Sequence, residues 1–226
     1  MPRFMPKRSQ LAKAFFCLAI VVQLLAQLTV LAGPAAAVDP WGTVLGAYKA
    51  ASGSNPVTAF SNGNWEWYPD RLSGHGKKWQ CVEFVNRFYA AVYGLEIEGG
   101  DAKYYFQRAT NKGLIACPNG SMAPPQPGDI LCSEGPPYGH VAIVRTVGPE
   151  GLHIIQQNWF NDERDFDMVL SLKMEGGRCF VGNFGPKHPI CGWLRSPQAG
   201  EPGKFVVPVK ATPAPKPAPA QSASNS

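Results

Sequence analysis

Residues 79–89 read Trp-Gln-Cys-Val-Glu-Phe-Val-Asn-Arg-Phe-Tyr, and this stretch decides the fold of the chain. Gly94 is a suitable C-terminal stop for a helix that begins here. The preceding run, residues 73–78, is rich in glycine and lysine and has no helical pattern. Cys81 is therefore expected in the first turn of a helix, directly after a loop. Four apolar residues at helical spacing predict the buried face of this helix: Cys81, Val85, Phe88 and Val92.

A cysteine at a helix start is a candidate nucleophile. The free backbone N–H groups and the dipole of the first turn favour an anion, so they stabilise the thiolate of Cys81. Two alternatives remain open from this stretch alone. Cys81 is also consistent with a small core residue or with one half of a disulfide.

The first 37 residues have the form of a signal peptide. A positive segment precedes an apolar run over residues 14–33, and Ala35-Ala36-Ala37 fits the cleavage rule, with Val38 as the first mature residue. An uncleaved membrane anchor is the alternative, because the apolar run approaches a spanning length. A lipid anchor at Cys17 fits less well, because two phenylalanines precede it. We expect a secreted protein, located in the periplasm, the cell wall or outside the cell, with no membrane segment after cleavage.

The charge of the mature chain is nearly balanced. The formal net charge of +5 arises from 21 basic and 16 acidic residues. Four of the basic residues and none of the acidic ones lie in residues 1–37, which leaves 17 against 16, or +1. The basic isoelectric point therefore gives no argument for nucleic acid, and no nucleic-acid partner is expected.

The cysteine count singles out Cys81. Six cysteines are present, and Cys17 leaves with the signal, so five remain. An odd number in an oxidising compartment indicates one free thiol. The other four form two local couples, which predicts two disulfides, Cys117 with Cys132 and Cys179 with Cys191; buried free thiols are the alternative. Zinc is not expected, because the chain has no Cys-x-x-Cys or His-x-x-x-His spacing.

The order of elements predicts an α+β fold. A second helix is expected from Asp101 to Thr110, and the chain beyond Asp129 has the texture of short strands. Helices first and strands afterwards indicate a helix packed on an antiparallel sheet. We expect one domain at residues 38–196. Residues 197–226, rich in proline and alanine, are expected to form a disordered tail.

His140 is the candidate base among the four histidines. It opens the apolar strand that continues as Val-Ala-Ile-Val, and the glycine before it lets another segment approach. A lone histidine at a strand start is usually only a polar end group, but a free cysteine at a helix start gives it a partner. The other three histidines lie in less informative contexts: His75, His153 and His188.

A base needs a residue that orients its ring. The strand predicted at residues 152–158 turns back on the strand of His140. A loop over residues 148–150 places His140 opposite Asn158 and puts Gln156 on the same face. Both amides are therefore candidates for the orienting residue.

Taken together, these motifs resemble the CHAP domain, the cysteine, histidine-dependent amidohydrolase/peptidase family. The resemblance rests on Trp-Gln-Cys-Val-Glu-Phe-Val, Gly-Asp-Ile-Leu, Gly-His-Val-Ala-Ile-Val and Gln-Gln-Asn in this order, and it covers about residues 41–196. Flanking blocks near Trp41, at Pro118-Asn119-Gly120-Ser121 and at Gly192-Trp193 also resemble the amidase domain of glutathionylspermidine synthetase/amidase.

The resemblance implies a papain-like fold of the NlpC/P60 type, with Cys81 as nucleophile and His140 as base. Gln156 stands where the family usually has glutamate, so the resemblance favours Asn158 as the orienting residue. The backbone N–H of Cys81 and the side-chain amide of Gln80 are the expected oxyanion donors. The related amidase carries arginine where Asn86 stands, which removes one means of reading a substrate carboxylate.

The function that follows is a secreted thiol amidohydrolase or peptidase, which cleaves an amide through a thioester without metal or cofactor. The expected substrate is peptidoglycan, at the muramoyl–alanine amide or in the stem peptide. Two alternatives are a small amide of the glutathionylspermidine type and a cell-wall binding module without activity. We expect the protein to act as a monomer.

Overall fold

The computed structural model describes residues 38–50, 55–64, 72–97 and 99–199. These residues all belong to the compact unit that begins at Val38. The predicted signal peptide at 1–37 and residues 200–226 of the predicted tail lie outside the described residues. No helix in the described part combines the length and apolarity needed to cross a membrane.

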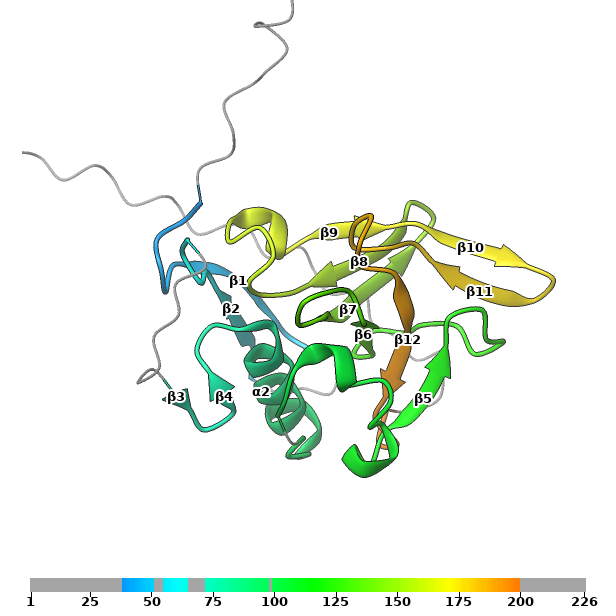
Figure 1. Ribbon diagram of the computed structural model, residues 1–226, viewed down its shortest axis with the longest axis horizontal. Helices are drawn as coiled ribbons and strands as arrows, with labels where there is room; N and C mark the ends of the chain where they lie inside the picture. The colour runs from blue at the N-terminus through cyan, green and yellow to red at the C-terminus, as the bar shows by residue number, and fades with distance from the viewer. Residues whose placement is uncertain (1–37, 51–54, 65–71, 98, 200–226) are drawn as a thin grey trace, which may run out of the picture. The chain divides into compact units, whose positions relative to one another are not determined.

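A six-stranded antiparallel sheet is the centre of the fold (Figure 1). Its strand order is β5-β12-β6-β7-β8-β9. The bounds of the strands are β5 Ile115–Pro118, β6 Ile130–Ser133, β7 His140–Gly148, β8 Gly151–Ile155, β9 Met168–Leu170 and β12 Ile190–Arg195. Three two-stranded pairs accompany it: β1 Val44–Tyr48 with β2 Val57–Phe60, β3 Leu72–Ser73 with β4 Gly76–Lys77, and β10 Leu172–Glu175 with β11 Arg178–Val181.

Helix α2 spans Cys81–Tyr93 and follows the short β3–β4 hairpin. Gly94 closes it in the left-handed conformation with φ of 63°, and its N–H bonds back to the last turn, as the sequence predicts. The described residues contain this one α-helix. The segment expected as a second helix instead forms two 3-10 turns, η1 Ala102–Tyr104 and η2 Thr110–Lys112. The Lys103 N–H, a first-turn donor without an acceptor inside the turn, bonds to the Tyr138 carbonyl at 2.8 Å and ties this segment to the loop before His140.

The two faces of the sheet bury different cores. One face packs against α2, and its cluster includes Ile130, Val141 and Ile143 together with Phe84 and Phe88 of the helix. The opposite face carries Leu131, Ala142, Val144 and Trp193, and β11 adds Cys179 and Val181 to the same cluster. Alternation along β6 and β7 sends neighbouring residues to opposite faces, so the α+β architecture that the sequence predicts is present.

The β7–β8 hairpin contains a bulge that sets the position of His140. The loop is shorter than expected, because Gly148 pairs with Gly151 and Val147 with Leu152. An extra residue at Arg145 then shifts the register, so that Ile143 pairs with Ile155. This restores the pairing that would place His140 opposite Asn158. Strand β8 nevertheless ends at Ile155, so that pair does not form.

Candidate active site

Cys81 is the first residue of α2, and its thiol lies against the start of β7. Backbone N–H groups of Val141, Val82 and Cys81 itself are directed at the sulfur. Burial raises the pKa of Cys81 to about 11, and these three N–H groups only partly oppose that shift. The thiol is therefore protonated at neutral pH in the substrate-free state. The three N–H groups would stabilise the thiolate once the proton has left.

His140 opens β7, directly before the residue whose N–H faces the Cys81 sulfur. Its ring is 2% exposed and packs between Trp159, at 4.7 Å between centroids, and Phe184, at 4.9 Å. Burial lowers the pKa of His140 to about 3, and the hydrogen bond that the ring donates to Gln156 acts in the opposite direction. Gly139 is left-handed at φ of 74°, and a Cβ there would overlap the backbone of Lys103 and Ser133, which explains the glycine at this position.

Gln156, and not Asn158, contacts the base. Gln156 Oε1 lies 2.8 Å from His140 Nε2. The Nε2 of Gln156 donates to Asp165 Oδ1 at 3.2 Å, and this fixes which end of the amide faces the ring. Because Gln156 presents an acceptor, His140 Nε2 must carry the proton. Nδ1 of His140 is then the unprotonated nitrogen that can accept a proton from a thiol.

Asp165 is the functional residue that sequence reasoning missed. It is fully buried at the end of the 3-10 turn η3 Glu163–Asp165 and accepts hydrogen bonds from the backbone N–H groups of Trp159, Phe160 and Asn161 at 3.3, 2.9 and 2.9 Å. Burial raises its pKa, and these donors oppose the rise. The Asp165 carboxylate therefore reaches His140 only through the Gln156 amide. No periodic pattern in the sequence predicts this aspartate.

Asn158 lies away from His140, so the expectation that it orients the base is wrong. Its backbone leaves the strand direction with φ of 61°. Its Nδ2 donates to Gln80 Oε1 at 2.7 Å, and its Oδ1 accepts from Asn62 Nδ2 at 2.8 Å. The residue between the two candidates, Gln157, instead bonds to the Gln80 carbonyl at 3.2 Å. Three successive amides thus hold the base and the residue before the nucleophile.

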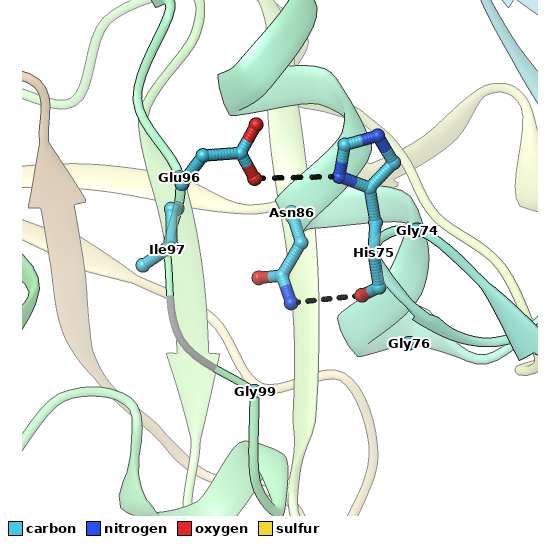
Figure 2. A pocket seen from close by; sticks show the side chains of 7 residues that line it. All are labelled: Gly74, His75, Gly76, Asn86, Glu96, Ile97 and Gly99. Atoms are coloured by element: carbon cyan, nitrogen blue, oxygen red, sulfur yellow. Dashed lines mark hydrogen bonds and ion pairs between the residues drawn. The ribbon is translucent and has the colours of Figure 1, made fainter.

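The other three histidines lie in different environments. His75 lines a pocket of about 350 Å³ with Asn86 and Glu96, and its Nδ1 lies 3.6 Å from Glu96 Oε2 (Figure 2). Neither Cys81 nor His140 lines this pocket. His153 bonds to two carboxylates on the sheet surface. His188 packs edge-on against Trp159 at 5.0 Å, and its charge would lower the pKa of His140.

The predicted disulfides are absent, because all five described cysteines are free. Cys117 belongs to one core cluster, whereas Cys132 belongs to the other, across the sheet. Cys117 and Cys132 also flank β12 on either side, which separates them by two strand spacings, or roughly 10 Å. Cys179 and Cys191 are divided between the two clusters in the same way. Proximity in sequence therefore misled the prediction. Among the described residues, no group of three side chains suited to a metal ion occurs.

Comparison with known proteins places the chain in context. The model of the CHAP domain matches residues 72–158, a range that contains Cys81, His140 and Gln156. Bifunctional glutathionylspermidine synthetase/amidase from Escherichia coli (strain K12) is 27% identical over 142 residues. The same protein from Shigella flexneri gives the same identity. Each alignment covers 55% of this chain and 23% of the relative, so the chain corresponds to a minor part of those proteins.

Proposed function

Residues 72–158 of the chain match the model of the CHAP domain, and we propose from this premise that the protein is a thiol-dependent hydrolase of amide bonds in peptidoglycan. The domain and the amidase relatives support a hydrolase that acts on C–N bonds. The observation that carries the proposal is the position of the Cys81 thiol, at a helix start and against the strand that His140 opens. The papain-like arrangement of NlpC/P60 type belongs to the same proposal.

The first step couples proton transfer to attack. His140 Nδ1 takes the proton from the Cys81 thiol as the sulfur forms a bond to the carbonyl carbon of the amide. The pKa of Cys81 is raised and that of His140 is lowered, so the resting pair is neutral and not an ion pair. Proton transfer therefore accompanies the attack. The Gln156–Asp165 relay keeps Nδ1 of His140 unprotonated for this role.

The negative charge that develops on the carbonyl oxygen needs donors. The backbone N–H of Cys81 and the side-chain Nε2 of Gln80 are the candidates, and a donor of this kind contributes roughly 3 kcal/mol to transition-state stabilisation. The C–N bond then breaks as His140 returns its proton to the leaving amine. Water attacks the thioester with His140 as base, and the free thiol and a carboxylic acid result.

Peptidoglycan is the substrate that we favour, and three sequence features support it: the predicted export signal, the proline- and alanine-rich composition after residue 196, and the match to the CHAP domain. The small-amide alternative is favoured by the identity to glutathionylspermidine synthetase/amidase. It is disfavoured by Asn86, because Asn86 Nδ2 donates to the His75 carbonyl at 3.1 Å and Asn86 Oδ1 accepts from the Tyr105 hydroxyl at 2.7 Å. These two bonds hold the Asn86 amide within the protein, and the neutral amide offers a substrate carboxylate no positive charge, unlike an arginine.

Digestion of purified sacculi tests the proposal. The mature protein should release fragments, and mass spectrometry of the new termini should show either free muramic acid lactyl groups or cut stem peptides. Cys81→Ala should release none. Glutathionylspermidine serves as the competing substrate in parallel. Release of spermidine without action on sacculi would support the small-amide alternative, and inactivity on both, with binding to sacculi, would support the binding module.

A further inference from the structure

We propose that Asn158 is a positioning residue that holds the Gln80 side chain as an oxyanion donor, with Asn62 as its anchor. This inference rests on the proposed function and deepens it. The sequence suggests that Asn158 orients the base His140. We assign it a different role, in which it positions the donor to the carbonyl oxygen that Cys81 attacks.

The hydrogen bonds run in one direction from the protein interior to Gln80. Asn62 is 1% exposed, and its backbone N–H donates to Asn161 Oδ1 at 3.0 Å, so it is fixed at the start of the chain of contacts. Its Nδ2 donates to Asn158 Oδ1 at 2.8 Å, and Asn158 Nδ2 donates to Gln80 Oε1 at 2.7 Å. The oxygen of the Gln80 amide is therefore occupied.

The opposite end of the Gln80 amide is free. No described residue accepts a hydrogen bond from Gln80 Nε2, and this atom belongs to the residue directly before the nucleophile. The Gln80 main chain is also held, because its carbonyl accepts from Gln157 Nε2 at 3.2 Å. A carboxamide fixed at its oxygen points its N–H₂ in one direction without further ordering during the reaction, and such preorganised donors are the effective ones.

The backbone at Asn158 is built for this contact. Its φ of 61° lies in the left-handed region, which non-glycine residues adopt rarely and asparagine more readily than most. Asn161 has a similar φ of 58°, and the Asp165 carboxylate accepts from the backbone N–H groups of Trp159, Phe160 and Asn161 itself. The turn that Asp165 stabilises thus directs Gln156 toward His140 and Asn158 toward Gln80.

The test uses two reagents that do not depend on the natural substrate. With p-nitrophenyl acetate, the Cys81 sulfur bonds to the acetyl carbon, the ester C–O bond breaks, p-nitrophenolate leaves and the thiol proton passes to His140; this reaction forms an oxyanion. Alkylation by iodoacetamide expels iodide by direct displacement and forms none. Asn158→Ala should slow acylation about 10-fold and Gln80→Ala about 100-fold, while alkylation rates of both variants stay within twofold of wild type.

Matched variants sharpen the result. Gln80→Glu keeps the oxygen that Asn158 holds but removes the donor, so it should lose acylation as Gln80→Ala does. Asn158→Ala combined with Gln80→Ala should be no slower than Gln80→Ala alone, because the two act through one contact. The control is Asn111→Ala, because Asn111 is an exposed residue of η2, and circular dichroism checks folding. Losses that multiply in the double variant, or an equal slowing of alkylation, would overturn the inference. Acylation that shows these effects without any action on sacculi would refute the proposed substrate alone.

Discussion

Two histidines in one β-hairpin have opposite acid–base properties. His140 begins β7, is buried between aromatic rings and has an amide as its partner. His153 lies in β8, and its Nδ1 and Nε2 contact Asp167 at 2.7 Å and Glu150 at 2.5 Å. Partial burial disfavours protonation of His153, but the two carboxylates outweigh it and raise its pKa, whereas burial lowers the pKa of His140 to about 3.

The difference teaches how a base is kept available. Direct contact with carboxylates favours the charged form of a histidine, as at His153, and only the neutral form can accept a proton. The chain therefore places Asp165 behind Gln156, where it fixes the tautomer of His140 without raising the pKa above its ordinary value. A search for the catalytic base by its contact with a carboxylate would have selected His153 instead of His140.

The largest expected effect separates the two histidines directly. His140→Ala should lower kcat/KM on sacculi by at least about 10³-fold, comparable to Cys81→Ala, because the thiol loses its base. His153→Ala should stay within about twofold of wild type. Initial rates of dye release from labelled sacculi measure both. Equal losses in the two histidine variants would show that the base is misassigned.

The second prediction concerns the neutral resting pair. With its pKa raised from 9.0 to about 11, Cys81 should react with iodoacetamide at pH 7 roughly 100-fold more slowly than a cysteine in an unstructured peptide. The rate should rise through the alkaline range. Mass spectrometry of the alkylated peptide follows the reaction. A rate plateau that begins in the acid range would instead indicate a thiolate–imidazolium pair.

Exchanging the amide and the carboxylate should give His140 the character of His153. In the variant Gln156→Glu with Asp165→Asn, a carboxylate contacts the ring and favours the imidazolium, and this charge in turn favours the Cys81 thiolate. Alkylation at pH 6 should become about 10-fold faster than in wild type. Asp165→Asn alone is the matched control; it removes a charge that raises the pKa of Cys81, so it should accelerate alkylation less than the exchanged variant does. An unchanged alkylation profile in the exchanged variant would contradict the role given to the relay.

The smallest effect is on stability, at His153. Its folded-state pKa is raised, so its contribution to stability is fully present below the pKa of the unfolded chain and is lost as the pH rises through the folded-state value. Because both carboxylates are about half exposed to solvent, which screens the contact, His153→Gln should cost less than about 1 kcal/mol at pH 5 and close to nothing at pH 9. Urea unfolding at both pH values measures this, and a larger loss at pH 9 would contradict the sign.

Local patterns predicted the elements well. The helical spacing of Cys81 and its neighbours and the stop at Gly94 gave α2 almost to its ends, and the β-branched runs gave β6, β7 and β12. The sequence also named both Cys81 and His140, which the structure brings to neighbouring elements. These features depend on periodicity over a few residues, and such periodicity is visible in the sequence.

The remaining features depend on contacts between distant residues. Asp165 reaches Gln156 only because a left-handed turn at Asn158 folds the chain back, and nothing in the local pattern predicts where β8 ends. The cysteine pairs failed for a related reason. Which face of the sheet a cysteine occupies depends on strand register, so Cys117 and Cys132 are close in sequence and separated in space.

The bulge at Arg145 divides the β7–β8 hairpin into two pairing registers. Between Arg145 and the tip, Val147 pairs with Leu152, and on the other side of Arg145 the register is shifted by one residue, so that Ile143 pairs with Ile155. The Arg145 guanidinium holds Asp167 at 2.5 Å, which anchors the bulge from a neighbouring segment. Arg145 therefore takes part in neither register. Its deletion would leave the pairs on both sides of it in place and turn the bulged ladder into a regular one, so His140 would keep its face while the ion pair between Arg145 and Asp167 is lost.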